Sequence, residues 1–147
     1  MAVNPGIEGK RYPPAPPYAV GREKVREFAR AVFATSPIHH DVEAARAAGY
    51  ADLVAPPTFP IVVGAALETL IEDPEAGIDF GRVVHGDQRF VLARPIVAGD
   101  ELTARLTVTA VRVVGGNAMV TAESALTDAD GEHVATSISS LVVRGDS

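Results

Sequence analysis

Hydrophobic positions recur with two different periods along this chain, and the change between them divides it into two parts. Residues 21–33 repeat apolar side chains at i, i+3, i+4 and i+7, which predicts an amphipathic helix. Residues 101–110 instead alternate apolar and polar side chains, many of them β-branched, which predicts a half-buried strand. The alternation returns over 117–127 and 133–143, and an earlier strand is predicted over 82–94. The sequence therefore predicts helices followed by four long antiparallel strands.

Turn signals separate two short helical segments in the first part. Pro37 disfavours helical geometry at Ser36, so the chain turns there and presents the following residues on a loop. Asp41 is then predicted to be the N-cap of a short helix that runs to Ala48 and is ended by Gly49.

The segment 56–60 opens a longer helix whose apolar residues, from Ile61 to Ile71, leave almost no polar face. Such a helix must be wrapped on most sides. The sequence therefore predicts an α+β fold in which an antiparallel sheet curls around one long central helix. Residues 1–17 are rich in proline and predict an extended N-terminal arm. Because a length of 147 residues is ordinary for a single domain, we expect residues 1–147 to form one domain.

Composition narrows the classes of function. The content of 47% hydrophobic and 22% charged residues is that of a folded globular chain. The net charge of −6 provides no basic surface for phosphate backbones or anionic membranes, so we expect neither nucleic acid nor membrane as a partner. The absence of cysteine excludes disulfides, thiolate metal sites and cysteine nucleophiles. No secretory signal or apolar run of spanning length is visible, and we expect a cytoplasmic protein.

Four segments together resemble the MaoC-like, (R)-specific enoyl-thioester hydratase family, which has the hot-dog fold. They are the Ser-Pro-Ile-His-His-Asp run at 36–41, the Gly-Tyr turn at 49–50, the stretch at 53–59 and the stretch at 94–100. Residues 18–24, taken with the Ala-Pro-Pro-Thr-Phe stretch, are most similar to the MaoC N-terminal-domain subfamily. That subfamily includes the HadA-type partner subunits of heterodimeric 3-hydroxyacyl-carrier-protein dehydratases.

The resemblance implies a catalytic role for His39. In active members an aspartate five residues earlier assists this histidine, and that position is held here by Ala34. A glycine N–H at the start of the central helix binds the thioester carbonyl in those members. The corresponding residue here is Pro57, which has no N–H. The resemblance also implies three substrate-binding residues at a dimer interface: Ser36, Thr58 and Phe59.

With two of three catalytic elements replaced, the resemblance implies an acyl-thioester-binding subunit of a 3-hydroxyacyl-ACP/CoA dehydratase that is weak or inactive alone. Its expected partners are an acyl-CoA or acyl-ACP thioester and a second hot-dog subunit, in a homodimer or in a heterodimer with a catalytic MaoC-like chain. One alternative is an active homodimeric (R)-specific enoyl-CoA hydratase that uses His39. Another is a non-enzymatic acyl-binding or interaction protein. No cofactor is expected.

Other roles for these polar residues stay open at this point. His39 can be a hydrogen-bonded loop histidine with no catalytic role. An acid that replaces the missing aspartate could be Asp41, although its capping role occupies it, or Asp87 on the predicted strand. Glu68 is a carboxylate in the central helix, where hot-dog thioesterases place theirs. We expect no metal site, because the adjacent His39, His40 and Asp41 rarely point at one ion.

Overall fold

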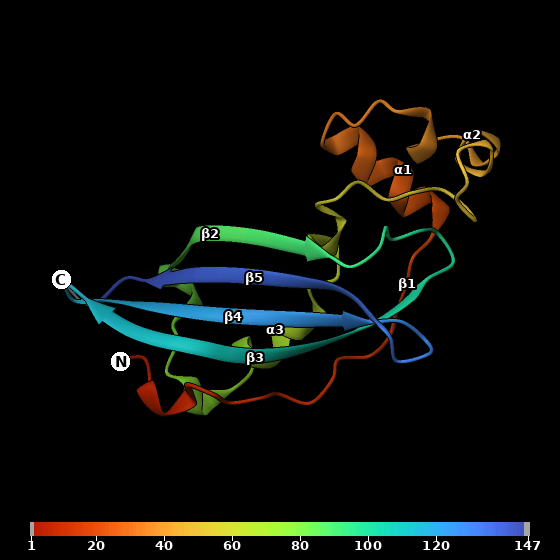
Figure 1. Ribbon diagram of the computed structural model, residues 1–147. Coiled ribbons are helices and arrows are strands. Elements are labelled where there is room, and N and C mark those ends of the chain that lie inside the picture. Colours follow the sequence, from red (N-terminus) through yellow and green to blue (C-terminus); the bar gives the residue numbers. More distant parts are fainter. Residues whose placement is uncertain (1, 146–147) are drawn as a thin grey trace.

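The computed structural model describes residues 2–145, in which a five-stranded antiparallel sheet curls over a short helix (Figure 1). The strands follow the order β1-β3-β4-β5-β2 across the sheet. Their bounds are β1 (Tyr18–Ala19), β2 (Val83–Leu92), β3 (Glu101–Val114), β4 (Asn117–Thr127) and β5 (His133–Val143). The predicted α+β class, with the sheet curled around the central helical segment, is confirmed.

Strands β2 to β5 coincide closely with the predicted alternating segments, because one face of the sheet is buried and the period of two fixes which residues face inward. Strand β3 is longer than predicted and runs to Val114. It ends in a hairpin turn at Gly115 and Gly116, whose φ angles of 57° and 85° suit glycine. The two-residue strand β1 was not predicted.

The predicted long central helix is wrong in its continuity. A 3₁₀ turn, η3 (Phe59–Val62), is followed by a separate α3 (Ala65–Ile71) that begins after Gly64. Proline in the first turn, consecutive β-branched residues and a glycine all weaken a continuous α-helix here. Ile61 and Ile71 are each 47% exposed, so the expected wrapping on most sides is incomplete in the single chain.

The N-terminal arm is more than an extended lead-in. Its backbone follows the outer edge of β3, where the Tyr12 N–H donates to Leu106 O and the Ala15 N–H donates to Ala104 O, both at 2.9 Å. The arm includes a 3₁₀ turn, η1 (Pro5–Ile7), and contributes four residues to the buried apolar set: Val3, Ile7, Tyr12 and Ala15. The β3 edge is therefore covered, while β2 forms the other edge and has no outer partner strand among residues 2–145.

An ionic cluster joins the arm to the end of α3. Tyr12 Oη donates to Asp73 Oδ2 at 2.5 Å, and Lys10 Nζ donates to the same oxygen at 2.8 Å. Hydrogen bonds from Lys10 and then from Tyr12 lower the pKa of Asp73 from its usual 3.8 to about 2. Burial, followed by the hydrogen bond to Asp73, raises the pKa of Tyr12 above its usual 10.0.

The helices before the sheet form a separate group at one end of it. Figure 1 shows α1 (Arg22–Ala31) and α2 (Val42–Ala47) beyond the arrowhead of β2, with α3 lying against the sheet itself. The 3₁₀ turn η2 (Pro37–His39) connects α1 to α2, and η4 (Pro74–Ala76) and η5 (Phe80–Arg82) lie between α3 and β2. The predicted cap of α2 is confirmed, because Asp41 accepts a hydrogen bond from the N–H of Glu43. Within residues 2–145, no helix has the length and apolar character needed to span a membrane.

Candidate functional site

The loop that carries His39 is set up by an unusual end to α1. Phe33 has a φ angle of +59°, and the N–H of Ala34 donates back to Ala29 O at 2.8 Å. This backbone pattern ends a helix most easily when glycine holds the left-handed position. The reversal leads into η2, whose Pro37 at the first position is compatible with a turn start.

His39 is buried, with 9% of its surface exposed, and its Nδ1 lies 2.6 Å from Val54 O. A carbonyl oxygen can only accept, so Nδ1 is the donor, and in the neutral imidazole the lone pair lies on Nε2. The N–H of Val54 donates in turn to Ile38 O at 2.9 Å. The residues around Val54 are themselves pinned by bonds from Ala55 N to Ile96 O and from Ala98 N to Leu53 O. The imidazole is therefore fixed in orientation and retains one basic nitrogen.

His40 has a structural role. Its Nε2 donates to Ala34 O at 2.8 Å, and Arg26 Nε donates to His40 O at 3.0 Å. These bonds tie the loop to α1. Within residues 2–145, no group of three or more His, Asp or Glu side chains is arranged to hold a metal ion.

A cavity of about 560 Å³ lies beside His39. It is lined by Ile38, His39, Tyr50, Val54, Ala55, Pro57, Leu92, Ala93, Arg94 and Pro95. His39 and Pro57, which the resemblance matches to the catalytic histidine and to the carbonyl-binding glycine, thus lie in one cavity. The lining contains no carboxylate. Its one cation, Arg94, is held by Asp100 at 2.8 Å and by Asp128 at 3.3 Å.

Three predicted substrate-binding residues lie outside the lining of this cavity. Ser36 and Thr58 are exposed to solvent. Phe59 has no exposed surface and packs edge-on against Phe28, with ring centroids 5.5 Å apart. Ala34 is half-buried, and its carbonyl is occupied by His40. Of the four residues expected to share a pocket at a dimer interface, the single chain places His39 alone in the lining of this cavity.

Pro57 has no N–H, and most backbone donors of the surrounding turn are already used. The N–H of Ala55 is bonded to Ile96 O, and that of Phe59 is bonded to Pro56 O. The N–H of Thr58 makes no hydrogen bond to the described part of the chain. Residues 55–59 thus offer one free donor, which lies one residue later than the family's glycine.

The carboxylates considered from the sequence do not replace the missing aspartate. Asp41 caps α2 through Oδ1. Asp87 lies on β2 with Arg89 at 3.3 Å, five residues before Leu92 of the cavity, which is about 16 Å along a strand. Glu68 is exposed and lines a different cavity of about 580 Å³, between α3 and the end of the arm.

Sequence reasoning missed Tyr50 and Arg94 as members of the cavity. Both were visible in segments that carry the family resemblance, but neither was predicted to be a site residue. A turn that ends α2 brings Tyr50 back beside His39, because its N–H donates to Ala45 O at 3.0 Å. Their position depends on contacts between distant segments, which local patterns do not specify.

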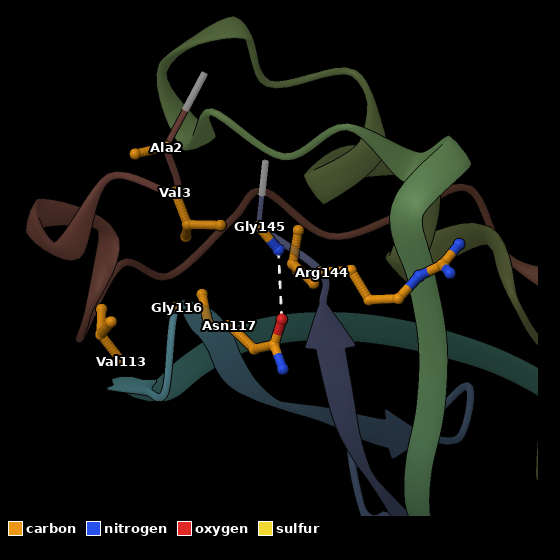
Figure 2. A pocket seen from close by; sticks show the side chains of 9 residues that line it. Ala2, Val3, Val113, Gly116, Asn117, Arg144 and Gly145 are labelled. Carbon is orange, nitrogen blue, oxygen red and sulfur yellow. Dashed lines mark hydrogen bonds between the residues drawn. The ribbon is translucent and has the colours of Figure 1, made fainter. Parts of the chain in front are cut away.

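A further cavity, of about 200 Å³, lies at the opposite end of the sheet (Figure 2). It is lined by apolar residues and glycines around Asn117 and Arg144. The Asn117 side chain accepts the N–H of Gly145 at 3.2 Å, and the Arg144 side chain extends away from the cavity in Figure 2. With no carboxylate or imidazole in its lining, this cavity offers no group for acid–base chemistry.

Comparison with known proteins agrees with the fold and the resemblance. Residues 8–137 match the model of the FAS1-like, dehydratase domain region. The chain is 68% identical over 147 residues to a UPF0336 protein from Leifsonia xyli subsp. xyli, covering 99% of both chains.

Two solved structures are similar over almost the whole chain. One is a complex of HadBC, a (3R)-hydroxyacyl-ACP dehydratase from Mycobacterium tuberculosis, at 38% identity and a TM-score of 0.81, covering 92% of this chain and 96% of that one. The other is a MaoC-like dehydratase, at 38% identity and a TM-score of 0.86, covering 95% of this chain and 42% of that one. The expected hot-dog fold is confirmed, and the chain belongs to the FAS1-like dehydratase-domain family within the MaoC-like hot-dog proteins.

Proposed function

We propose that this protein is an acyl-thioester-binding, HadA-type subunit of a 3-hydroxyacyl-ACP/CoA dehydratase, and that it lacks a complete active site of its own. The observation that carries the proposal is the composition of the His39 cavity. It contains an oriented imidazole, no carboxylate, and a proline where a backbone donor would stand.

Hydration of an enoyl thioester, like the reverse dehydration of a 3-hydroxyacyl thioester, requires two proton movements and support for a developing enolate oxygen. His39 Nε2 can accept one proton, but no acid in the lining handles the other. Loss of a positioned acid–base partner typically costs about two to four decades of rate. Loss of an oxyanion donor costs about two to three more. A subunit with both deficits depends on a competent site elsewhere in its complex.

The sheet offers a place for such a partner. The arm covers the β3 edge, whereas the β2 edge presents unpaired backbone together with Val84 and Val91, which are 50% and 56% exposed. Open edges of this kind are normally covered in native proteins. The similar HadBC structure is a complex of dehydratase subunits, which supports pairing with a second hot-dog subunit.

The test measures hydration of enoyl-CoA thioesters by the protein alone, by a MaoC-like partner that carries the complete aspartate–histidine pair, and by the two together. We expect no turnover by the protein alone and strong turnover by the mixture. His39→Gln should leave the activity of the mixture within about threefold, whereas alanine at the partner's catalytic histidine should abolish it.

Two other outcomes would contradict the proposal in distinguishable ways. Robust turnover by the protein alone, lost in His39→Ala, would identify an active homodimeric hydratase. Binding of acyl thioesters without turnover in any mixture would identify a non-enzymatic acyl-binding protein.

A further inference from the structure

A small cavity of about 80 Å³ lies between η3, the start of α3 and the inner face of the sheet. Its helical side is apolar and consists of Pro60, Ile61, Val63, Gly64 and Leu67. Its sheet side includes four polar residues from three strands: His85, Ser124, Ser137 and Ser139. Leu106 and Ala122 complete the sheet side. The cavity therefore has one apolar wall and one mixed wall, and the four polar residues of the mixed wall are called the polar wall below.

The polar wall is organised by a hydrogen-bond network. Gln88 Nε2 donates to Ser137 Oγ at 2.9 Å, and Ser139 Oγ donates to Gln88 Oε1 at 2.6 Å. Ser124 lies opposite Ser137 in the β4–β5 register. The side chains of Ser124 and His85 make no hydrogen bond to the described part of the chain. Hydrogen-bonding capacity therefore remains free at the cavity.

This polar wall interrupts an otherwise apolar inner face. Every second residue of β3 from Leu102 to Val108 is apolar and buried, as are Val120 and Ala122 of β4 and Leu141 and Val143 of β5. Packing of the sheet against helices requires apolar groups at such positions. Ser137 and Ser139 of β5 cannot provide such apolar packing. Packing of the core therefore does not explain the polar wall.

We propose that this cavity binds the distal part of an acyl group that carries a hydrogen-bonding oxygen, such as a hydroxyl or keto group remote from the thioester. The inference rests on the proposed function, because it names the class of acyl thioester that the subunit takes. The apolar wall contacts the methylenes, and the free hydroxyl of Ser124 and the imidazole of His85 bind the oxygen.

Selectivity for an oxygen-bearing acyl group follows from how each kind of acyl chain interacts with the polar wall. A cavity of this size and polarity suits a few ordered waters. A plain hydrocarbon chain displaces them without replacing their hydrogen bonds, which lowers affinity. An acyl chain whose oxygen lies beside the polar wall replaces those hydrogen bonds.

The test uses isothermal titration calorimetry with the complex of the full chain and its MaoC-like partner. The probes are saturated acyl-CoA thioesters of four to twelve carbons, each compared with its terminally hydroxylated form. At the best length, we expect the hydroxylated probe to bind about tenfold more tightly. The Gln88→Leu/Ser124→Ala/Ser137→Ala/Ser139→Ala variant should remove the preference and gain affinity for the plain chain.

Two further variants keep the result interpretable. Ser124→Ala alone leaves the Gln88 network intact and should still reduce the preference. Ser140 lies on the opposite face of β5, so Ser140→Ala should leave the preference for the hydroxylated probe unchanged. Equal affinity for plain and hydroxylated probes at every length would overturn this inference alone. Failure of the complex to bind any acyl thioester would overturn the proposed function as well.

Discussion

The Nδ1 atom of His39 and the carbonyl oxygen of Val54 are joined by a 2.6 Å hydrogen bond that fixes the tautomer and the plane of the imidazole. In many catalytic histidines a carboxylate or backbone carbonyl at this position leaves the other nitrogen free for chemistry. This chain therefore orients its imidazole in the way that many catalytic histidines are oriented. Under the proposed function, the residues that would act together with His39 are the ones that this chain lacks.

Repair of those parts should be possible only in combination. We expect Ala34→Asp alone to give little activity, because Pro57 still supplies no backbone N–H at the position of the family's glycine, a deficit of about 3 kcal/mol. The Ala34→Asp/Pro57→Gly variant should exceed either single variant, as measured by loss of enoyl absorbance with the isolated protein. Adding His39→Ala should abolish whatever the double variant gains. Strong activity of the unmodified protein would contradict this prediction.

Association should depend on the β2 edge. We expect light scattering at micromolar concentration to show a particle larger than the 15.3 kDa chain. Val91→Lys places a charge on this exposed edge and should shift the protein toward the monomer. Val113→Lys is the matched control, because Val113 is 73% exposed but lies near the β3–β4 hairpin. A monomeric unmodified protein, or equal effects of both lysines, would argue against pairing through β2.

The cluster of Lys10, Tyr12 and Asp73 should make stability fall in acid. The pKa of Asp73 is about 2 in the folded chain and near 3.8 when unfolded, so its contribution is present above about pH 4 and is lost as the pH falls toward 2. Asp73→Asn should cost about 2 kcal/mol at neutral pH, because two charged or short hydrogen bonds are weakened. Thermal unfolding across this pH range should show a flatter profile for the variant.

Asp87→Asn is the control for that experiment, since Asp87 lies in an exposed pair with Arg89. Tyr12→Phe should also lower the free energy of unfolding, by about 1 kcal/mol. An acid profile of Asp73→Asn that parallels the unmodified protein would show that the cluster does not govern acid stability.

The end of α1 should be improved by glycine. Phe33 adopts a left-handed φ of +59° and is 88% exposed, so its side chain contributes little burial. Phe33→Gly should therefore raise the free energy of unfolding by about 0.5–1 kcal/mol, because glycine removes the steric cost of this conformation. Chemical denaturation measures the change. A loss of stability would show that the Phe33 ring makes a stabilising contact, for example across a subunit interface.

The strands were predictable because alternation is a local property that burial of one sheet face enforces. Strands β4 and β5 match the predicted bounds, and Asp41 caps α2 as its position before the helix indicated. The break between η3 and α3 was harder to predict. Its apolar composition favours burial, whereas Pro60, the β-branched residues and Gly64 oppose one continuous helix, and the sequence does not show which effect prevails.

The candidate site was predictable only in part, since a motif names residues without their surroundings. His39 is buried beside a cavity that also contains Pro57, in keeping with the motif. The burial of Phe59 against Phe28, and the presence of Tyr50 and Arg94 in the cavity lining, arise from packing between segments far apart in the sequence. The substrate-binding roles of Ser36, Thr58 and Phe59 stay predictions.

The N-terminal arm, which runs alongside β3, also limits how many subunits can assemble. A sheet with two bare edges can add strands at both sides and grow into an open-ended fibre. In this chain the Tyr12 and Ala15 amides already occupy carbonyls of β3, which leaves β2 as the bare edge of the described sheet. Edge pairing between two such chains consumes both bare edges at once, so growth by this route terminates at two subunits.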